Sequence, residues 1–472
     1  MIQTIKDLVS AKADTTVALA REIWGYAELS YEETKSAAAL IAALKQEGFT
    51  IEEGIADIPT AFTATYQCGS GKPVVGFLAE YDALSGLSQK AVCPVQEAVQ
   101  EGGAGHGCGH NLLGAGCYAA AVALKDYLIK EKKDGTVIFF GCPAEEGAGS
   151  KQFIARAGYF DNVDFAYTWH PETVNEVGSR GSVAIMGANF IFDGIAAHAG
   201  GEPHLGRSAL DAVELMNVGC NYMREHMIPD ARVHYAVTDT GGDAPNVGQA
   251  HAEVIYSVRA PRVDQVCELA ERVHNIARGA ALMTETKVEI QVVSAYADVL
   301  QNKVLDNLVY GHMKEIFPLD YSHEELDYAE KFHAVGDPGD WTLYQTMAAK
   351  IMGENGKAFF RGAMADVCVP PLPLKQGSTD VGDVSWNVPS AWFGSACFAL
   401  GTPAHSWLAV AQGKSSIAHR GMTGAASVLA RTALELMERP ELVEAAWEEM
   451  KEAKKNCEYR CLIPEDVRAG SF

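Results

Sequence analysis

Four short stretches of the chain carry apolar residues on both alternating faces. They cover residues 72–84, 135–147, 163–171 and 390–405. This pattern is typical of strands that are buried between two layers of helices. Helical stretches at 111–133 and 150–160 separate the first three. The alternation predicts an α/β fold in which a mixed sheet is covered by helices on both faces.

Each of the four predicted strands ends in side chains that can bind a metal ion. In chain order these are Glu80 and Asp82, Glu145 and Glu146, His170, and His405. In open α/β sheets the carboxyl ends of parallel strands meet at one edge, where ligands bind. We therefore expect these residues, although far apart in the sequence, to meet along that edge.

The pattern changes between about residues 187 and 300. A strand-like run that ends in GIAAHAGGEPH is followed by a helical stretch at 208–227 and two strand-like runs at 231–242 and 249–261. A helical stretch at 263–283 and a last strand-like run at 286–300 complete the region. This β-α-β-β-α-β order predicts a compact, ferredoxin-like α+β insertion. The predicted domains are a discontinuous catalytic domain at 1–186 and 301–472, and an inserted domain at 187–300.

The composition of the chain argues against several classes of function and location. The chain has 472 residues and a formal net charge of −23, which argues against nucleic acid and anionic membrane surfaces as partners. We find no apolar run of membrane-spanning length and no signal-peptide core at the N-terminus. Eleven scattered cysteines, an odd number, do not indicate a disulfide framework. These features predict a cytoplasmic protein.

The stretch GHGCGHNLLG, from Gly105 to Gly114, places Cys108 and His110 two residues apart before a predicted helix. The pair suits a nucleophile and its base, two metal ligands, or a loop without chemistry, and alone it does not decide among them. The glycines allow the backbone to approach other groups closely. The N-terminus of the following helix would favour the Cys108 thiolate, which is the metal-binding form.

Adjacent glutamates, Glu145 and Glu146, stand in the stretch CPAEEG at the end of the second predicted strand. Adjacent side chains point in different directions, so one carboxylate can face a metal while its neighbour faces the substrate. A solvated acidic turn is the alternative in an acidic protein. The position between an apolar strand and glycines favours an active-site edge.

Thiolate, imidazole and carboxylate donors together favour zinc, manganese or a similar cation over magnesium or calcium. The set suffices for one metal, or for two that share ligands about 3.5–4 Å apart and activate a water. A cysteine-nucleophile hydrolase, with Cys108 attacking and His110 or another histidine as base, is the competing chemistry. It leaves the glutamates and the later histidines without a role, so we favour the metal hypothesis.

The motifs GCGHN, PAEEG, WHP and PAHSW occur in this order along the chain. With them the chain resembles the co-catalytic metallo-aminoacylase and carboxypeptidase family, in its amidohydrolase branch, over nearly its whole length. The resemblance implies a zinc-peptidase-like catalytic domain, an inserted dimerisation or lid domain, and one or two divalent metal ions, zinc or manganese. The metal ligands it implies are Cys108, His110, Glu146, His170 and His405.

The resemblance also implies roles for residues outside the ligand set. Glu145 matches the general base, and His198 matches a histidine that stabilises the oxyanion, often across a dimer. Asn246 and Arg259 match positions that hold the substrate carboxylate, and Asp82 matches an aspartate that supports the metal site from behind.

The implied activity is metal-dependent hydrolysis of the amide bond of an N-acyl amino acid. The expected substrate is p-aminobenzoyl-glutamate, which would place the reaction in folate catabolism, or a related aroyl or acyl amino acid or dipeptide. The implied assembly is a homodimer or a hetero-oligomer with a homologous subunit. The alternative is a partner subunit with little activity alone, but the presence of every ligand and of the base favours the enzyme.

Three departures from the branch pattern concern the substrate more than the metal chemistry. Glu80-Tyr81-Asp82 stands where the branch has Asp-x-Asp, so Glu80 is not expected among the ligands. Residues 23–29, IWGYAEL, lack the usual His and Pro of the N-terminal signature. The insert at 85–104 is long and is expected to shape the pocket mouth.

Overall fold

The computed structural model describes residues 2–178, 182–339, 377–455 and 459–471, together with residue 457 and several positions between 342 and 369. Its contacts divide the chain into two compact units. Unit 1 is formed by described residues within 1–181, 300–375 and 384–456, and unit 2 by those within 182–299, 376–383 and 457–472.

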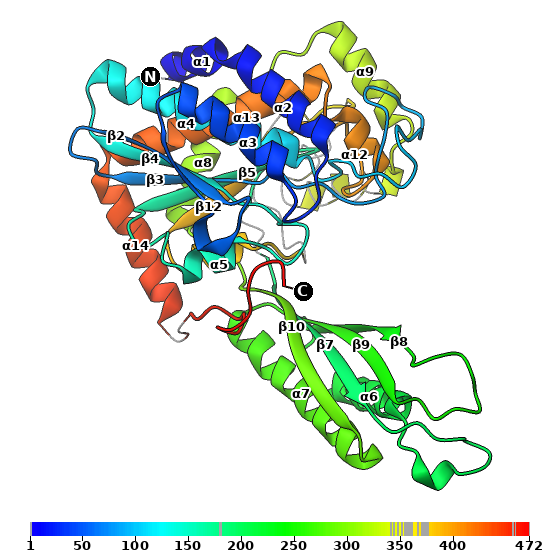
Figure 1. Ribbon diagram of the computed structural model, residues 1–472. Coiled ribbons are helices and arrows are strands. Elements are labelled where there is room, and N and C mark those ends of the chain that lie inside the picture. The colour runs from blue at the N-terminus through cyan, green and yellow to red at the C-terminus, as the bar shows by residue number, and fades with distance from the viewer. Residues whose placement is uncertain are drawn as a thin grey trace. The chain divides into compact units, whose positions relative to one another are not determined.

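An eight-stranded sheet organises the described part of unit 1, in the order β1-β2-β4-β3-β5-β12-β6-β11 (Figure 1). Its central strands β4, β3, β5 and β12 are parallel neighbours. They are the four strands that the apolar pattern predicted, while the outer strands were not predicted. Their bounds are β1 Thr50–Glu53, β2 Phe62–Cys68, β3 Val74–Ala79, β4 Gly135–Gly141, β5 Phe165–Glu172, β6 Asn175–Val177, β11 Cys368–Val369 and β12 Ser390–Ala396.

Helices cover both faces of this sheet. On one face α4, α8 and α13 contact the strands, and α1, α2 and α14 pack on these helices. On the other face, α5 leads into a segment in which the Phe160 ring contacts Phe140 of β4, with ring centroids 4.8 Å apart. The bounds of the helices in this unit are α1 Ile2–Ala11, α2 Ala13–Tyr26, α3 Thr34–Gln46, α4 His110–Glu131, α5 Lys151–Arg156, α8 Lys303–Ile316, α9 His323–His333, α12 Trp407–Gln412, α13 Ser416–Glu438 and α14 Pro440–Lys454. The short helix α11, Val381–Ser385, crosses the boundary between the sequence ranges of the two units.

The long helix α4 is the central helix of unit 1. Among the described helices it is the one whose length and composition would allow it to cross a membrane, but 89% of its most apolar window is buried inside the protein. Its small residues permit close packing: a Cβ at Gly116 would lie 2.7 Å from the Trp169 ring of β5. The helix is therefore a core helix, and its N-terminus is fixed against the sheet.

Unit 2 has the predicted β-α-β-β-α-β order. Its four strands form an antiparallel sheet in the order β10-β7-β9-β8. Helices α6 and α7 contact each other and the sheet, and the Ser208 side chain caps α6 by accepting the Asp211 amide. The bounds are β7 Ala184–Asp193, α6 Ala209–Met223, β8 Arg232–Asp239, β9 His251–Ala260, α7 Val263–Thr284 and β10 Lys287–Tyr296.

Two short segments that the sequence pattern assigned to the catalytic domain belong to unit 2 in the structure. The Tyr459 hydroxyl donates to Asp383 Oδ1 at 2.7 Å, and Asp383 Oδ2 accepts the Ala297 amide at 3.0 Å. Burial raises the pKa of Asp383 to about 7. This buried carboxylate joins three distant parts of the chain, a contact that no local pattern predicts.

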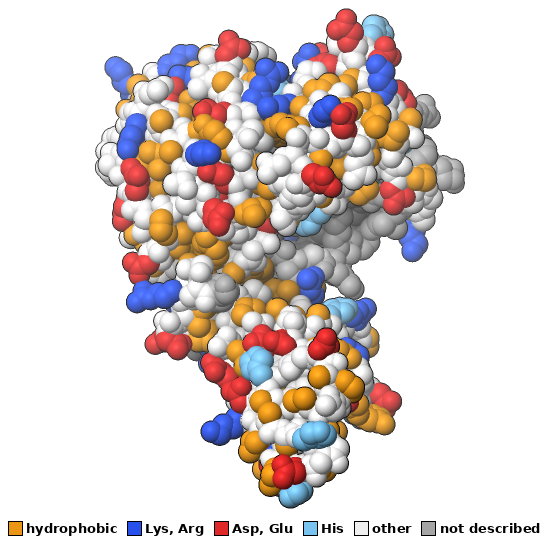
Figure 2. Space-filling view, turned by 45° about the vertical axis from the view of Figure 1, so that its right-hand side comes forward, with side chains coloured by type: hydrophobic (Ala, Val, Ile, Leu, Met, Phe, Trp, Pro, Cys, Tyr) orange, Lys and Arg blue, Asp and Glu red, His pale blue; other side chains and the backbone are white. Residues whose placement is uncertain are grey.

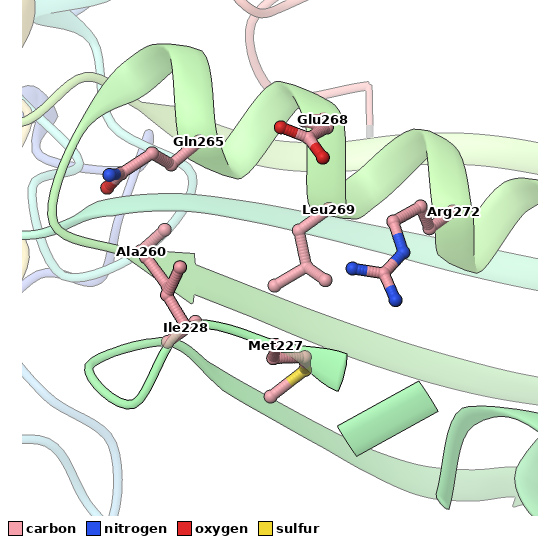
Figure 3. Close-up of a pocket in the computed structure, with 8 residues that line it drawn as sticks. Met227, Ile228, Ala260, Gln265, Glu268, Leu269 and Arg272 are labelled. Carbon is pink, nitrogen blue, oxygen red and sulfur yellow. The ribbon is translucent and has the colours of Figure 1, made fainter. Parts of the chain in front are cut away.

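The surface of unit 2 carries several apolar side chains (Figure 2). Tyr222 on α6 and Leu282 at the end of α7 are 70% and 80% exposed. A small cavity of about 60 Å³ lies between α7 and the segment before β8, lined by Ile228, Leu269 and Arg272 among others (Figure 3). None of the residues predicted for the site lines it.

Candidate metal centre

The predicted ligands meet at the carboxyl edge of the four parallel strands. Cys108 and His110 stand at the N-terminus of α4, Glu146 follows β4, His170 lies near the end of β5, and His405 precedes α12. Although the first and last are about 300 positions apart in the sequence, neighbouring strands bring them together.

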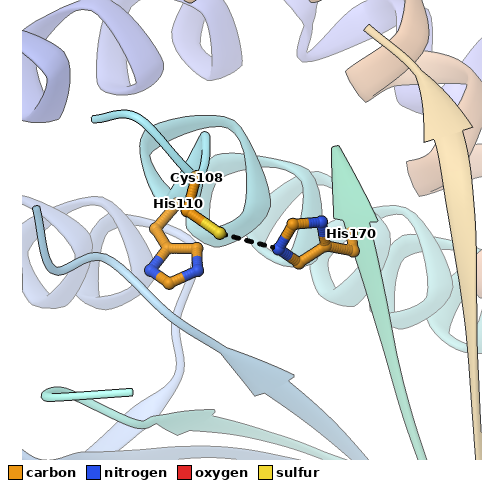
Figure 4. A group of neighbouring side chains, drawn as sticks. All are labelled: Cys108, His110 and His170. Atoms are coloured by element: carbon orange, nitrogen blue, oxygen red, sulfur yellow. Dashed lines mark hydrogen bonds between the residues drawn. The ribbon is translucent and has the colours of Figure 1, made fainter. Parts of the chain in front are cut away.

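Two groups of these side chains have donor atoms within 4.8 Å of one another: Cys108, His110 and His170, and Cys108, Glu146 and His405. In the first group, Cys108 Sγ lies 3.2 Å from His170 Nε2 (Figure 4). In the second group, His405 Nε2 lies 3.4 Å from Glu146 Oε1. Cys108 belongs to both groups, so its sulfur is placed between two candidate cation positions.

These separations fit a metal centre. Two donors that each lie about 2.0–2.3 Å from one tetrahedral cation are about 3.3–3.7 Å apart. His110 Nε2 and Glu146 Oε1 are two of the buried side-chain atoms, among the described residues, that make no hydrogen bond. Their charged neighbours Glu80 Oε2 and His405 Nε2 lie 3.3 and 3.4 Å away. Buried polar atoms normally have hydrogen-bond partners, so two such atoms in one cluster fit the ligation of a cation.

The glycines around Cys108 explain how the cluster closes. A Cβ at Gly107 would lie 2.5 Å from Leu87 Cδ1 and 3.3 Å from the His405 Cα. Gly109 has a φ of +80°, which side-chain-bearing residues rarely adopt. The loop therefore needs glycine at position 109, and glycine at 107 lets the insert and the His405 segment lie close to Cys108.

Asp82 contacts two members of the cluster. Asp82 Oδ1 is 2.8 Å from His110 Nδ1, and Asp82 Oδ2 accepts the Glu146 amide at 2.8 Å. The contact with Nδ1 leaves His110 Nε2 facing the cluster as a donor for a cation. One buried carboxylate thus orients two predicted ligands.

The charges of the cluster are strongly coupled. Burial acts to raise the pKa of the Cys108 thiol, but the nearby His170 and His110 hold it well below its usual range. Burial acts to lower the pKa of both histidines, but Cys108 raises it well above the usual range. Burial and the Cys108 charge raise the pKa of Glu146 to about 8. The protons held here are those that a bound cation would displace.

A buried ion pair that the sequence did not indicate lies beside the cluster. Lys151 Nζ is 2.6 Å from Glu80 Oε1, and the two side chains are 0% and 4% exposed. Glu80 Oε2 is 3.3 Å from His110 Nε2, and Glu80, His110 and Glu145 form a third group of neighbouring donors. Glu80 therefore lies next to the centre, with Lys151 as its counter-charge.

Two of the three predicted residues of unit 2 lie together. His198 and Val247 form a backbone bridge, and the Asn246 carbonyl accepts the Ala199 amide at 2.9 Å. His198 Nδ1 accepts the amides of Gly200 and Gly201 at 3.1 and 3.0 Å. The ring therefore carries its proton on Nε2, and as the residue is exposed this N–H is a potential donor.

Arg259 lies at the other end of strand β9. Its backbone pairs with Ile185 and Arg232, whereas the loop with Asn246 precedes the first residue of β9, His251. Arg259 stands eight positions after His251 along the strand, a distance of about 26 Å. Within unit 2 the structure thus places Arg259 apart from His198 and Asn246.

Comparison with known proteins agrees with this geometry. The model of peptidase family M20/M25/M40 matches residues 76–414. The B subunit of the p-aminobenzoyl-glutamate hydrolase of Escherichia coli is 44% identical over 98% of this chain and 97% of its own length. The mouse Xaa-Arg dipeptidase is 29% identical over 94% of this chain and 90% of its own length. The A subunit of the E. coli p-aminobenzoyl-glutamate hydrolase is 28% identical over 50% of this chain and 56% of its own.

Solved structures share the fold at low sequence identity. An aminobenzoyl-glutamate utilization protein from Klebsiella pneumoniae has a TM-score of 0.60 and 18% identity, covering 92% of this chain and 99% of its own. A Bacillus subtilis protein described as a dinuclear metal-binding peptidase from family M20 has a TM-score of 0.58 and 17% identity, covering 91% and 99%.

Proposed function

The chain belongs to peptidase family M20/M25/M40, and on that basis we propose that it is a metal-dependent amidohydrolase that cleaves the amide bond of an N-acyl amino acid. The observation that carries this proposal is the pair of donor groups that share Cys108 at the strand ends. The similarity to one of the p-aminobenzoyl-glutamate hydrolase subunits over 98% of the chain supports p-aminobenzoyl-glutamate as the first substrate to test.

We assign Cys108, His110, Glu146, His170 and His405 as the ligands of two divalent cations, zinc or manganese, with Cys108 in both sets. When bound, such cations would supply the positive charge that makes a water molecule a nucleophile at neutral pH and that stabilises the oxyanion. Asp82 keeps His110 in the orientation and tautomer that ligation needs.

We assign Glu145 as the general base. Its neighbour Glu146 belongs to a donor group with Cys108 and His405, while Glu145 is grouped with Glu80 and His110. Glu145 would take a proton from the attacking water and return it to the leaving nitrogen, which otherwise would have to depart as an amide anion. On this assignment, Cys108 acts as a thiolate ligand and forms no covalent bond to the substrate.

In the proposal, His198 donates its Nε2–H to the oxyanion, and Asn246 and Arg259 bind the substrate carboxylate. A substrate of dipeptide size spans about 7–11 Å, far less than the about 26 Å that separates the two ends of strand β9. One substrate would therefore contact His198 and Arg259 only if they came from different copies. This supports a dimer, or a hetero-oligomer with a homologous subunit, in which unit 2 acts as the dimerisation and lid domain.

We also propose a cytoplasmic location, because eleven scattered cysteines, an odd number, do not have the pattern of a disulfide framework.

The test is hydrolysis by the purified chain alone. Protein stripped of metal and reloaded with zinc or manganese is assayed against p-aminobenzoyl-glutamate, other aroyl and acyl amino acids and dipeptides. The expected result is metal-dependent release of the amino acid. Metal-loaded protein that cleaves none of these substrates would contradict the proposal.

The second candidate, a partner subunit with little activity alone, follows from the name of the E. coli relative, which is one of two differently named subunits of a hydrolase. Size-exclusion mass of the purified chain, together with turnover before and after adding a homologue of the other subunit, separates the two. Full turnover by the chain alone favours the enzyme, and turnover only after the addition favours the partner subunit.

A further inference from the structure

We propose that Glu33 is a positioning residue that fixes the turn carrying Glu145 and Glu146. The inference rests on the proposed function, in which these two glutamates are the base and a ligand. Glu33 belongs to the stretch ELSYEET, whose acidic residues have the pattern of a solvated helix start. In the structure its side chain is 0% exposed.

The turn after β4 has a strained backbone at Ala144. Its φ is +62°, a left-handed conformation at a residue with a Cβ. Such conformations are destabilising and persist only where the surroundings hold them. The Ala144 carbonyl accepts the amides of Gly147 and Gly149 at 3.2 and 2.9 Å, which closes the turn around the two glutamates.

Glu33 supplies the contact that holds this conformation. Its Oε1 accepts the Ala144 amide at 2.8 Å and the Tyr31 amide at 2.9 Å. Its Oε2 accepts the Thr60 hydroxyl at 3.0 Å. The Thr60 carbonyl in turn accepts the Tyr81 hydroxyl at 2.6 Å. The carboxylate is therefore fixed by three donors from separate parts of unit 1.

Two buried carboxylates thus fix the backbone on both sides of Glu145. Glu33 holds the Ala144 amide, and Asp82 holds the Glu146 amide at 2.8 Å. Asp82 also contacts the proposed ligand His110, so a change at Asp82 would affect the metal directly. Glu33 instead accepts hydrogen bonds from two backbone amides and a threonine hydroxyl, none of which belongs to a proposed ligand. The direction in which the Glu145 side chain leaves the backbone is therefore set by this pair, and Glu33 is the member whose effect can be tested apart from the metal.

The decisive experiment combines Glu33→Ala with Ala144→Gly. Removing the carboxylate frees the strained turn, so kcat should fall about 10- to 100-fold, as expected for a misplaced catalytic group. KM should change less than about threefold, because no substrate contact is removed. Glycine adopts a positive φ without strain, so adding Ala144→Gly should restore kcat to within about threefold of the Ala144→Gly variant.

Two further variants separate positioning from folding. Glu33→Gln retains an oxygen that can accept both amides and should keep kcat within about threefold of the wild type. Thr60→Val removes only the contact to Oε2 and is the matched control, with kcat near the wild-type value. If Glu33→Ala does not fold, a low kcat in folded Glu33→Gln would overturn the proposal. So would wild-type kcat in Glu33→Ala, or the absence of rescue by Ala144→Gly.

Hydrogen exchange of the segment 142–150 gives a readout that does not depend on activity. Exchange should be faster in Glu33→Ala than in the wild type and in Thr60→Val, and it should slow again in Glu33→Gln. If the wild-type chain hydrolyses no substrate, the proposed function fails, and this measurement still tests the role of Glu33. Unchanged exchange in folded Glu33→Ala would contradict that role.

Discussion

The buried pair of Lys151 and Glu80 makes a strong prediction about stability. Lys151→Met keeps most of the side-chain length and removes the charge, so the Glu80 carboxylate, only 4% exposed, loses its partner at 2.6 Å and is left beside His110 Nε2 at 3.3 Å. At 2.6 Å and an effective dielectric constant of about 20, the attraction between the two charges is about 6 kcal/mol. Since the lost attraction is partly offset by relaxation, we expect Lys151→Met to lower the free energy of unfolding by about 3–5 kcal/mol.

Urea unfolding monitored by tryptophan fluorescence measures this loss in unit 1 alone, because all seven tryptophans lie in the sequence ranges of that unit. A chelator keeps the protein free of metal, so that cation binding does not contribute. Lys45→Met is the matched control: its partner Glu53 is 3.0 Å away, but the side chains are 55% and 59% exposed. That variant should lose less than about 1 kcal/mol.

A double-mutant cycle completes the test. Combining Lys151→Met with Glu80→Gln removes both charges. The double variant should therefore lose at least about 2 kcal/mol less unfolding free energy than the two single variants lose in sum. Additivity within about 0.5 kcal/mol would refute the view that the two charges depend on each other. A loss in Lys151→Met no larger than in Lys45→Met would refute it as well.

Three other predictions concern catalysis and pH. Glu145→Gln should lose about 10²- to 10⁴-fold in kcat, because glutamine cannot accept the proton. Its metal content, measured by atomic spectroscopy, should stay unchanged. Loss of metal would mean that the roles of the two glutamates are exchanged. His198→Ala should raise the activation barrier by about 2.7–4 kcal/mol with unchanged metal content, and near-normal turnover would show that His198 only caps its glycine turn. Burial and then the charge of Glu449 raise the pKa of Asp306 from 3.8 to about 7. Between these two pKa values the folded state keeps a proton that the unfolded chain has released. The contribution of this group to the stability of unit 1 is therefore fully present below about pH 4. It amounts to up to about 4 kcal/mol and is lost as the pH rises to 7. Asp306→Asn should flatten this slope in the same fluorescence assay, and an unchanged slope would contradict the assignment.

The sequence predicted the parts of the molecule that repeat a simple pattern. The four central strands were found because each is apolar on both faces, and the residues at their ends were found because parallel strands share an edge. The short outer strands were missed: β2 alternates incompletely, from buried Phe62 to half-exposed Cys68, and β6 and β11 have three and two residues.

The charged residues that support the site could not be predicted, because their burial depends on tertiary contacts. Lys151 and Glu33 follow polar or glycine-rich stretches in which charged residues are normally solvated. Lys151 becomes buried because Glu80 faces it from a neighbouring strand end, and Glu33 because an amide of a distant turn requires an acceptor. The separation of Arg259 from Asn246, by contrast, follows from the extended conformation of the strand that the local pattern predicted at 249–261.

The contact between Tyr459 and Asp383 has a consequence for how the protein is made. Unit 2 begins at about residue 182, but part of it is contributed by residues after 456. A ribosome that adds about 5–20 residues per second needs roughly 14–55 s to synthesise the intervening stretch. During that time the nascent α+β unit lacks its last segment, and Asp383, once it is translated, still lacks the tyrosine that pairs with it. A chain that terminates shortly before residue 457 would therefore lack the last segment of unit 2. It would still contain every residue assigned to the metal centre.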